Sequence, residues 1–171
     1  AVDGLPTADA QDVMEICGGE SGVSTLSLRR KLRVGQNFDL RCGFNLTNPH
    51  HQQLLLQYVS KHKPLFVVMG PPCTAFSSWS HYNRVQHERA WLQALADGTT
   101  IANLCAHIAQ LQIKNGCHFI LENPRGSELF NLPQMVTLFS SGQVLTISFP
   151  QCALGLISPE GDAILKWTTL W

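Results

Sequence analysis

The chain has 171 residues, 44% of them hydrophobic, and its 12 basic and 12 acidic side chains give no net charge. This composition suits a compact, enzyme-like domain, expected over residues 13–171 after a linker-like segment 1–12, and the length favours a single domain. The balanced charge argues against a protein that holds nucleic acid with a strongly basic surface.

The first expected strand, residues 13–17, runs into a glycine-rich turn, and a helix is expected at residues 23–32. Glycine between a strand and a helix lets a ligand approach the backbone closely. The turn has neither the lysine of a P-loop nor the full dinucleotide spacing. Because Glu15 and Asp39 are acidic, the turn suits a ligand with hydroxyl and ammonium groups better than a polyphosphate. A purely structural turn remains the alternative, since many such turns carry glycine for packing.

The strand expected at residues 65–69 ends in Gly70-Pro-Pro-Cys73. Glycine and two prolines cannot continue the strand, so they set a rigid turn that presents a thiol. Ligands of open α/β sheets bind at the carboxyl ends of the strands, where Cys73 is expected. The alternative is a buried cysteine that acts as a small hydrophobic residue. Upstream of this strand, residues 37–41 are expected as a strand and residues 50–61 as a helix.

A second strand-end motif, Glu122-Asn123-Pro124, follows the strand expected at residues 117–121. Proline disfavours a helical residue before it, so this strand is expected to run into a fixed loop. The motif places a carboxylate at the same sheet edge as Cys73, and a nucleophile beside an acid or base is the general arrangement of covalent catalysis. The alternative is that Glu122 caps a helix or joins a surface ion pair.

The remaining elements alternate in a way that implies an α/β fold with a parallel sheet. A long helix is expected at residues 85–114, with an interruption near Gly98, and a short helix at residues 132–139. Strands are expected at residues 144–149 and 164–170, the second returning as an antiparallel edge strand after the turn at residues 158–162. The loop at residues 76–84 suits either a lid that stacks on a base or an ordinary surface loop anchored by Trp79 and Tyr82.

Taken together, the three motifs resemble the cytosine carbon-5 DNA methyltransferases in their order and approximate spacing. The motifs are Glu15-Ile-Cys-Gly-Gly-Glu-Ser-Gly22, Gly70-Pro-Pro-Cys-Thr-Ala-Phe-Ser77 and Glu122-Asn-Pro124. The chain also resembles methyltransferase-like modules of some retroelement polyproteins. The resemblance covers residues 13–124. It implies a Rossmann-like class I methyltransferase fold, a three-layer sandwich with a mostly parallel sheet and an antiparallel edge hairpin, which binds S-adenosylmethionine.

The resemblance also implies a mechanism and a set of site residues. Cys73, as thiolate, would attack carbon 6 of a cytosine, and Glu122 would hold the ring near its exocyclic amine while carbon 5 is methylated. The base must be flipped out of a duplex or be single-stranded, and DNA is preferred over RNA. Further substrate-binding residues are Thr74, Ser77, Asn123 and Pro124. The cofactor-binding residues are Glu15, Cys17, Gly18, Gly19, Asp39 (ribose hydroxyls), Asn45 (adenine), Gly70, Pro71 and Pro72.

The chain departs from the family pattern in ways that leave other functions open. The segment 149–155 stands where the family has an arginine-bearing loop, yet it has no arginine, and Lys166 is the nearest basic residue. No target-recognition domain is expected within residues 13–171, so nucleic-acid binding would need another domain or chain. One alternative is a catalytically degenerate module, a scaffold or cofactor-binding domain in a larger polyprotein. Another is a thiol enzyme of a different class that uses His81.

The cysteines and histidines do not predict a metal site. The six cysteines are scattered without a CxxC pair, and neither Cys105-x-His107 nor Cys117-His118 has a standard zinc spacing. No apolar run reaches the length of a membrane span. The first dozen residues lack the basic and apolar parts of a signal peptide. An intracellular location is therefore expected, with the nucleus as one option.

Overall fold

The structure is a computed structural model that describes residues 10–77 and 80–171. Within these, the chain forms two compact units: unit 1 runs to Met69 and also includes Ile108–Phe119, and unit 2 comprises Gly70–His107 and Ile120–Trp171. Most of the segment expected as a linker, together with Trp79 of the expected lid and the side chain of His81, lies outside the described residues.

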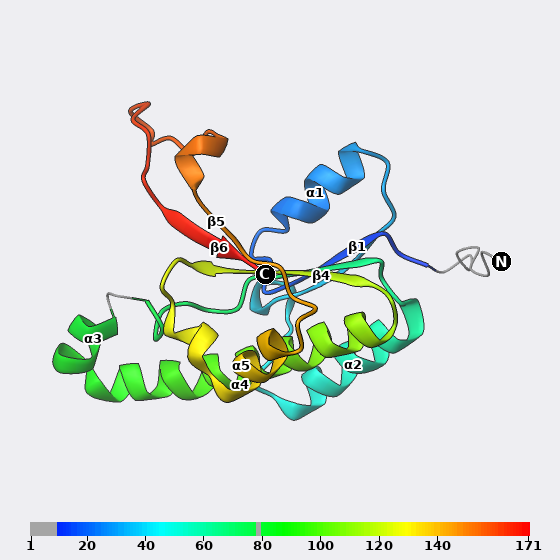
Figure 1. Cartoon of the computed structure of the whole chain (residues 1–171), viewed down its shortest axis with the longest axis horizontal. Helices are drawn as coiled ribbons and strands as arrows, with labels where there is room; N and C mark the ends of the chain where they lie inside the picture. The colour runs from blue at the N-terminus through cyan, green and yellow to red at the C-terminus, as the bar shows by residue number, and fades with distance from the viewer. Residues whose placement is uncertain (1–9, 78–79) are drawn as a thin grey trace. The chain divides into compact units, whose positions relative to one another are not determined.

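Six strands and five α-helices are described (Figure 1). Their hydrogen-bonded order is β2-β1-β3-β4-β6-β5. The elements to the end of β3 are β1 (Val13–Ile16), α1 (Gly22–Arg29), β2 (Val34–Phe38), η1 (Leu40–Cys42), α2 (Pro49–His62) and β3 (Phe66–Met69). Those that follow are α3 (Ser80–Gln86), α4 (Glu88–Lys114), β4 (His118–Pro124), η2 (Glu128–Asn131), α5 (Pro133–Ser140), β5 (Ile147–Pro150), η3 (Gln151–Leu154) and β6 (Trp167–Leu170).

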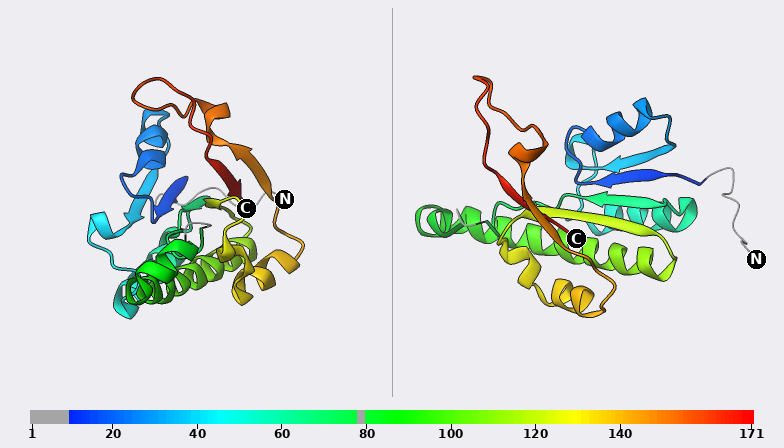
Figure 2. Two further views of the ribbon diagram at one scale, coloured as in Figure 1. Left: turned by 90° about the vertical axis from the view of Figure 1, so that its left-hand side faces the viewer. Right: turned by 45° about the horizontal axis from the view of Figure 1, so that its top comes forward.

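Unit 1 is an α/β layer arrangement around strand β1. All four residues of β1 are buried, and the strand pairs in parallel with β2 and with β3. A strand buried on both faces needs a helix on each side. Helix α1 covers one face of these strands and α2 the other (Figures 1 and 2). The expected parallel α/β architecture is therefore confirmed.

Strand β2 begins and ends three residues before the strand that the sequence predicted. It covers Val34–Phe38 rather than residues 37–41. The side chain of Asp39 accepts a hydrogen bond from the backbone N–H of Arg41 at 2.8 Å and so starts the short helix η1. An aspartate that bonds its own backbone two residues on favours a turn over a strand. Asp39 thus lies just beyond the carboxyl end of β2.

Unit 2 contains the antiparallel part of the sheet. Strand β6 pairs with β4, where Glu122 lies opposite Leu170, and on its other side with β5. The expected antiparallel pair at the sheet edge is confirmed, but the edge strand is β5, and β6 lies between β5 and β4. The Glu-Asn-Pro motif was expected in a loop. It forms the end of β4 instead, because Pro124 occupies the last strand position, where a missing N–H costs little.

The long helix differs from its prediction in where it is interrupted. The break lies at His87, between α3 and α4, and α4 continues through Gly98. Glycine at this position has a packing reason: a β-carbon there would lie 2.7 Å from Cε2 of Phe76. Phe76 is only 2% exposed. The glycine therefore lets α4 pass close to the loop that carries Cys73.

Candidate active site

The glycine turn between β1 and α1 is fastened to the end of β2. The backbone N–H of Gly18 donates to Oδ1 of Asn37 (3.3 Å), and that of Gly19 donates to Oδ2 of Asp39 (3.0 Å). Nδ2 of Asn37 donates to Oγ of Ser21 (2.7 Å). Asn37 is 5% exposed and was not among the predicted site residues, because a polar strand residue alone gives no sign of such a role.

Glu15 holds the other side of the same turn. Its side chain is buried, 2% exposed, and accepts hydrogen bonds from the backbone N–H groups of Val23 (3.3 Å) and Ser24 (2.7 Å) in the first turn of α1. A carboxylate there pairs with the positive end of the helix dipole. A β-carbon on Gly18 would lie 2.7 Å from Oε1 of Glu15, so this position requires glycine. The geometry thus gives Glu15 a positioning role in the turn.

Cys17 adopts a backbone conformation that is unfavourable for its residue type. Its φ is 54°, in the left-handed region that residues other than glycine seldom occupy. Burial raises the pKa of the Cys17 thiol to about 12, and the negative charge of Asp39 adds to the effect. The thiol therefore stays protonated at neutral pH and contributes an uncharged sulfur to the turn.

The structure brings predicted cofactor residues together around the turn that contains Cys17. Glu15, Gly18, Gly19 and Asp39 belong to one hydrogen-bonded turn. Asn45 is exposed and accepts from the backbone N–H (3.0 Å) and the hydroxyl (2.8 Å) of Thr47.

The glycine turn fits a ligand with hydroxyl and ammonium groups. The half-buried carboxylate of Asp39 suits such groups and would repel a phosphate. A β-carbon on Gly19 would meet no atom within 4 Å, so the backbone is open to a ligand there. The residues of the turn therefore fit S-adenosylmethionine, which carries ribose hydroxyls and an amino-acid ammonium group.

The Cys73 loop in unit 2 is a tight turn anchored by Phe76. Pro71 is buried, Pro72 and Thr74 are exposed, and Cys73 is half-buried. The carbonyl of Cys73 accepts from the backbone N–H groups of Phe76 (3.0 Å) and Ser77 (2.9 Å). Both bonds fix the backbone around the thiol and leave the thiol itself partly accessible.

Two hydrogen bonds join this loop to the chain around Glu122. Nδ2 of Asn123, a side chain with 0% exposure, donates to the carbonyl of Pro71 at 2.9 Å. The backbone N–H of Glu128 donates to the carbonyl of Phe76, also at 2.9 Å. Pro71 lies two residues before Cys73, and Asn123 directly follows Glu122. The Pro-Pro-Cys motif is thus bonded directly to the Glu-Asn-Pro motif, and the other end of the loop is bonded to η2.

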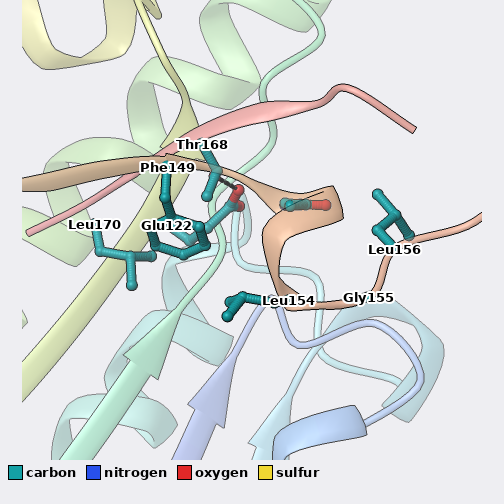
Figure 3. A pocket seen from close by; sticks show the side chains of 8 residues that line it. Glu122, Phe149, Leu154, Gly155, Leu156, Thr168 and Leu170 are labelled. Atoms are coloured by element: carbon teal, nitrogen blue, oxygen red, sulfur yellow. Dashed lines mark hydrogen bonds between the residues drawn. The ribbon is translucent and has the colours of Figure 1, made fainter. Parts of the chain in front are cut away.

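The side chain of Glu122 lines a cavity of about 450 Å³. The hydroxyl of Thr168, on β6, donates a hydrogen bond to the Glu122 carboxylate, and Figure 3 shows this contact with Phe149 and Leu170 nearby. Gln151 and Leu154 contribute further wall from η3, so the lining is mostly apolar around one carboxylate. Such a lining with few polar groups is typical of a binding pocket. Cys73 is not among the described residues that line it.

The cavity wall includes residues that the sequence did not assign to the site. Thr168 gave no signal, because a threonine in a strand is ordinary. The segment 149–155 was noted for its missing arginines, and the structure places Gln151 and Leu154 of this segment at the cavity. Ala153 and Gly155 are exposed. Lys166 is also exposed, and its carbonyl accepts from the N–H of Gln151 at 2.8 Å.

Comparison with known proteins gives a structural match and no sequence match. No protein-family model matches the chain, and no curated protein does. The crystal structure of the S. pombe Dnmt2 methyltransferase superposes with a TM-score of 0.50 at 12% sequence identity, over 94% of this chain. The chain has a Rossmann-like methyltransferase fold. It spans about half of that protein, 49% of its length.

Two other kinds of site are absent from the part of the chain that the structure describes. Over residues 10–77 and 80–171, no group of three or more histidine, cysteine, aspartate or glutamate side chains is arranged to hold a metal ion. Within the same ranges, no helix is both long and apolar enough to cross a bilayer.

Proposed function

We propose that this chain is an S-adenosylmethionine-dependent methyltransferase that modifies carbon 5 of cytosine, with DNA as the preferred nucleic acid. The observation that carries the proposal is the 2.9 Å hydrogen bond from Asn123 to the carbonyl of Pro71. It joins a cysteine loop to a glutamate-bearing strand within one unit of a chain with a methyltransferase fold. A nucleophile held beside a carboxyl group is what covalent catalysis on a base requires.

In this mechanism the side chains of unit 2 act on the base. The thiolate of Cys73 forms a bond to carbon 6, which makes carbon 5 electron-rich. Glu122, fixed by the Thr168 hydroxyl, accepts a hydrogen bond from the exocyclic amine and keeps the ring oriented. S-adenosylmethionine, when bound, would supply an electrophilic methyl group to carbon 5 and leave as S-adenosylhomocysteine. The proton on carbon 5 then leaves to solvent, and breaking the bond from sulfur to carbon 6 restores the ring and frees Cys73.

The glycine turn of unit 1 is the proposed cofactor-binding element. Asp39 would accept hydrogen bonds from the ribose hydroxyls, and the open backbone at Gly19 admits the ligand. Glu15 acts indirectly, because its carboxylate is bonded to the first turn of α1. Asn45 remains the residue proposed for the adenine.

A trapping experiment tests the proposal. Fluorine on carbon 5 cannot leave as a proton does, so a 5-fluorocytosine oligonucleotide should remain covalently attached to the enzyme after methyl transfer. We expect a denaturation-resistant adduct with the wild-type chain and S-adenosylmethionine, and none with Cys73→Ala. Cys152→Ala is the matched control, because Cys152 is also half-buried and lies in η3. DNA and RNA versions of the oligonucleotide identify the preferred substrate.

The rival proposal is a catalytically degenerate module that binds the cofactor as part of a larger, retroelement-type polyprotein. The observation that favours it concerns segment 149–155, which contains no basic residue. Its exposed positions 153 and 155 are Ala153 and Gly155, so no basic side chain of this segment can contact a substrate. Saturable binding of S-adenosylhomocysteine, without an adduct on either oligonucleotide, would support the rival and refute the enzyme.

A further inference from the structure

A second cavity of unit 2, about 230 Å³ in volume, lies where the Cys73 loop meets the start of α4. Its lining residues are Thr74, Asn83, His87, Ala90, Trp91 and Ala94. Ala90, Trp91 and Ala94 belong to α4, and His87, which directly precedes the helix, accepts a hydrogen bond from the N–H of Trp91 at 2.9 Å. The two alanines are small and leave the hollow open between the larger side chains.

The indole of Trp91 carries an unexplained polar group. Its Nε1 is buried and has no hydrogen-bond partner among the residues that the structure describes. A buried donor without a partner is costly, so such a group calls for a ligand or a bound water. This unpaired donor therefore belongs to a side chain that lines the cavity.

The other lining groups indicate which kind of ligand the cavity can bind. The hydroxyl of Thr74, the amide of Asn83 and the imidazole of His87 donate and accept hydrogen bonds. The alanine methyl groups and the indole ring supply flat apolar surface. A planar heteroaromatic ring with polar edges matches both properties. The volume is below the 300 Å³ or so of a typical drug-sized pocket, which favours one base over a whole cofactor.

A cation lies next to this cavity. The guanidinium carbon of the exposed Arg84 is 5.3 Å from the centre of the Trp91 ring. Arginine beside an aromatic ring is a combination that nucleic-acid-binding proteins use to contact a phosphate next to a stacked base. The cavity and Arg84 together suit a nucleotide.

The position of the cavity indicates which nucleotide it would take. Thr74, one of its walls, directly follows Cys73. We propose that the cavity holds the base of a nucleotide adjoining the target cytosine on the same strand, with Trp91 and Asn83 reading its edge. This inference rests on the proposed function, because it assumes that the base next to Cys73 is the target cytosine.

The test uses the full chain and a single-stranded oligonucleotide with one cytosine flanked by 2-aminopurine, a fluorescent base. Binding by the wild-type chain should change the 2-aminopurine emission. Trp91→Phe keeps an aromatic ring but removes the indole N–H, and Asn83→Leu removes the amide, so each should weaken binding roughly fivefold to tenfold. Gln93→Ala is the matched control, because Gln93 is an exposed residue of α4 that bonds Asp97. It should bind like the wild type.

The outcomes separate this inference from the proposed function. If Asn83→Leu and Trp91→Phe bind the oligonucleotide as tightly as Gln93→Ala does, the inference is wrong. The same holds if wild-type binding leaves the 2-aminopurine emission unchanged, or if the wild type does not bind. Thermal unfolding identifies any variant that has lost its fold. If Trp91→Phe does not fold, Asn83→Leu, at a half-buried position, still tests the inference. If the two variants bind the oligonucleotide more weakly than Gln93→Ala but the wild type forms no Cys73 adduct, the base-binding cavity is supported and the proposed methyltransferase activity is refuted.

Discussion

Replacing Gly98 by alanine is expected to destabilise the protein, although alanine ordinarily stabilises a helix interior by about 1 kcal/mol relative to glycine. The new methyl group would lie 2.7 Å from Cε2 of Phe76, well inside the normal contact distance. Phe76 is 2% exposed and cannot swing into solvent. Overpacking of this kind costs about 1–3 kcal/mol. The net result should lie between no change and a loss of about 2 kcal/mol.

The same substitution should lower activity, because Phe76 anchors the Cys73 loop through the bond to Glu128. A displacement of the order of 1 Å at a reacting group reduces rates by up to about 100-fold, so we expect at least roughly tenfold slower adduct formation. The assays are urea unfolding and trapping on the 5-fluorocytosine oligonucleotide.

Gly22→Ala is the control for the helix effect, since a β-carbon at Gly22 in α1 would meet no atom within 4 Å. Phe76→Leu should cost less in the Gly98→Ala background than in the wild type, because the shorter side chain relieves the contact. A Gly98→Ala variant that gains about 1 kcal/mol in free energy of unfolding and keeps full activity would refute this reasoning.

Three further changes have expected outcomes. Because burial raises the pKa of Cys17 to about 12 from its usual 9.0, the unfolded chain loses this proton first as the pH rises. Between those two pH values the free energy of unfolding of the wild type should therefore fall by up to about 1.4 kcal/mol per pH unit relative to that of Cys17→Ala. Urea unfolding at pH 8 and about pH 10 tests this, and an equal change in the two proteins would contradict it. Lys63→Gly, at the left-handed C-cap of α2 with φ 43°, should raise the free energy of unfolding by about 1 kcal/mol in thermal unfolding, and a loss would speak against the strain. Glu15→Ala should lower the free energy of unfolding by about 0.5–2 kcal/mol and weaken S-adenosylhomocysteine binding in calorimetry. Unchanged affinity would show that Glu15 does not support cofactor binding.

Local patterns in the sequence were enough for the elements that depend on near neighbours. The buried run of β1, the glycine turn after it and the strand before Gly70 follow from hydrophobic runs and from glycine and proline. These patterns gave the α/β class, and the structural match confirmed the Rossmann-like methyltransferase fold. They misplaced the ends of β2 and the break before α4. The end of β2 depends on a hydrogen bond that the Asp39 side chain accepts from the N–H of Arg41, and Gly98 lies inside α4 because it packs against Phe76.

The amino-acid sequence by itself determined which residues carry reactive groups: the thiol of Cys73 and the carboxylate of Glu122. Only the tertiary structure decided what surrounds them. The bond from Asn123 to Pro71 joins positions 52 residues apart, and Thr168 reaches Glu122 across 46 residues. Neither Asn123 nor Thr168 has a local pattern that indicates its partner. Contacts of this kind follow from the register of β4 with β6 and from the burial of both side chains, which the folded chain alone fixes.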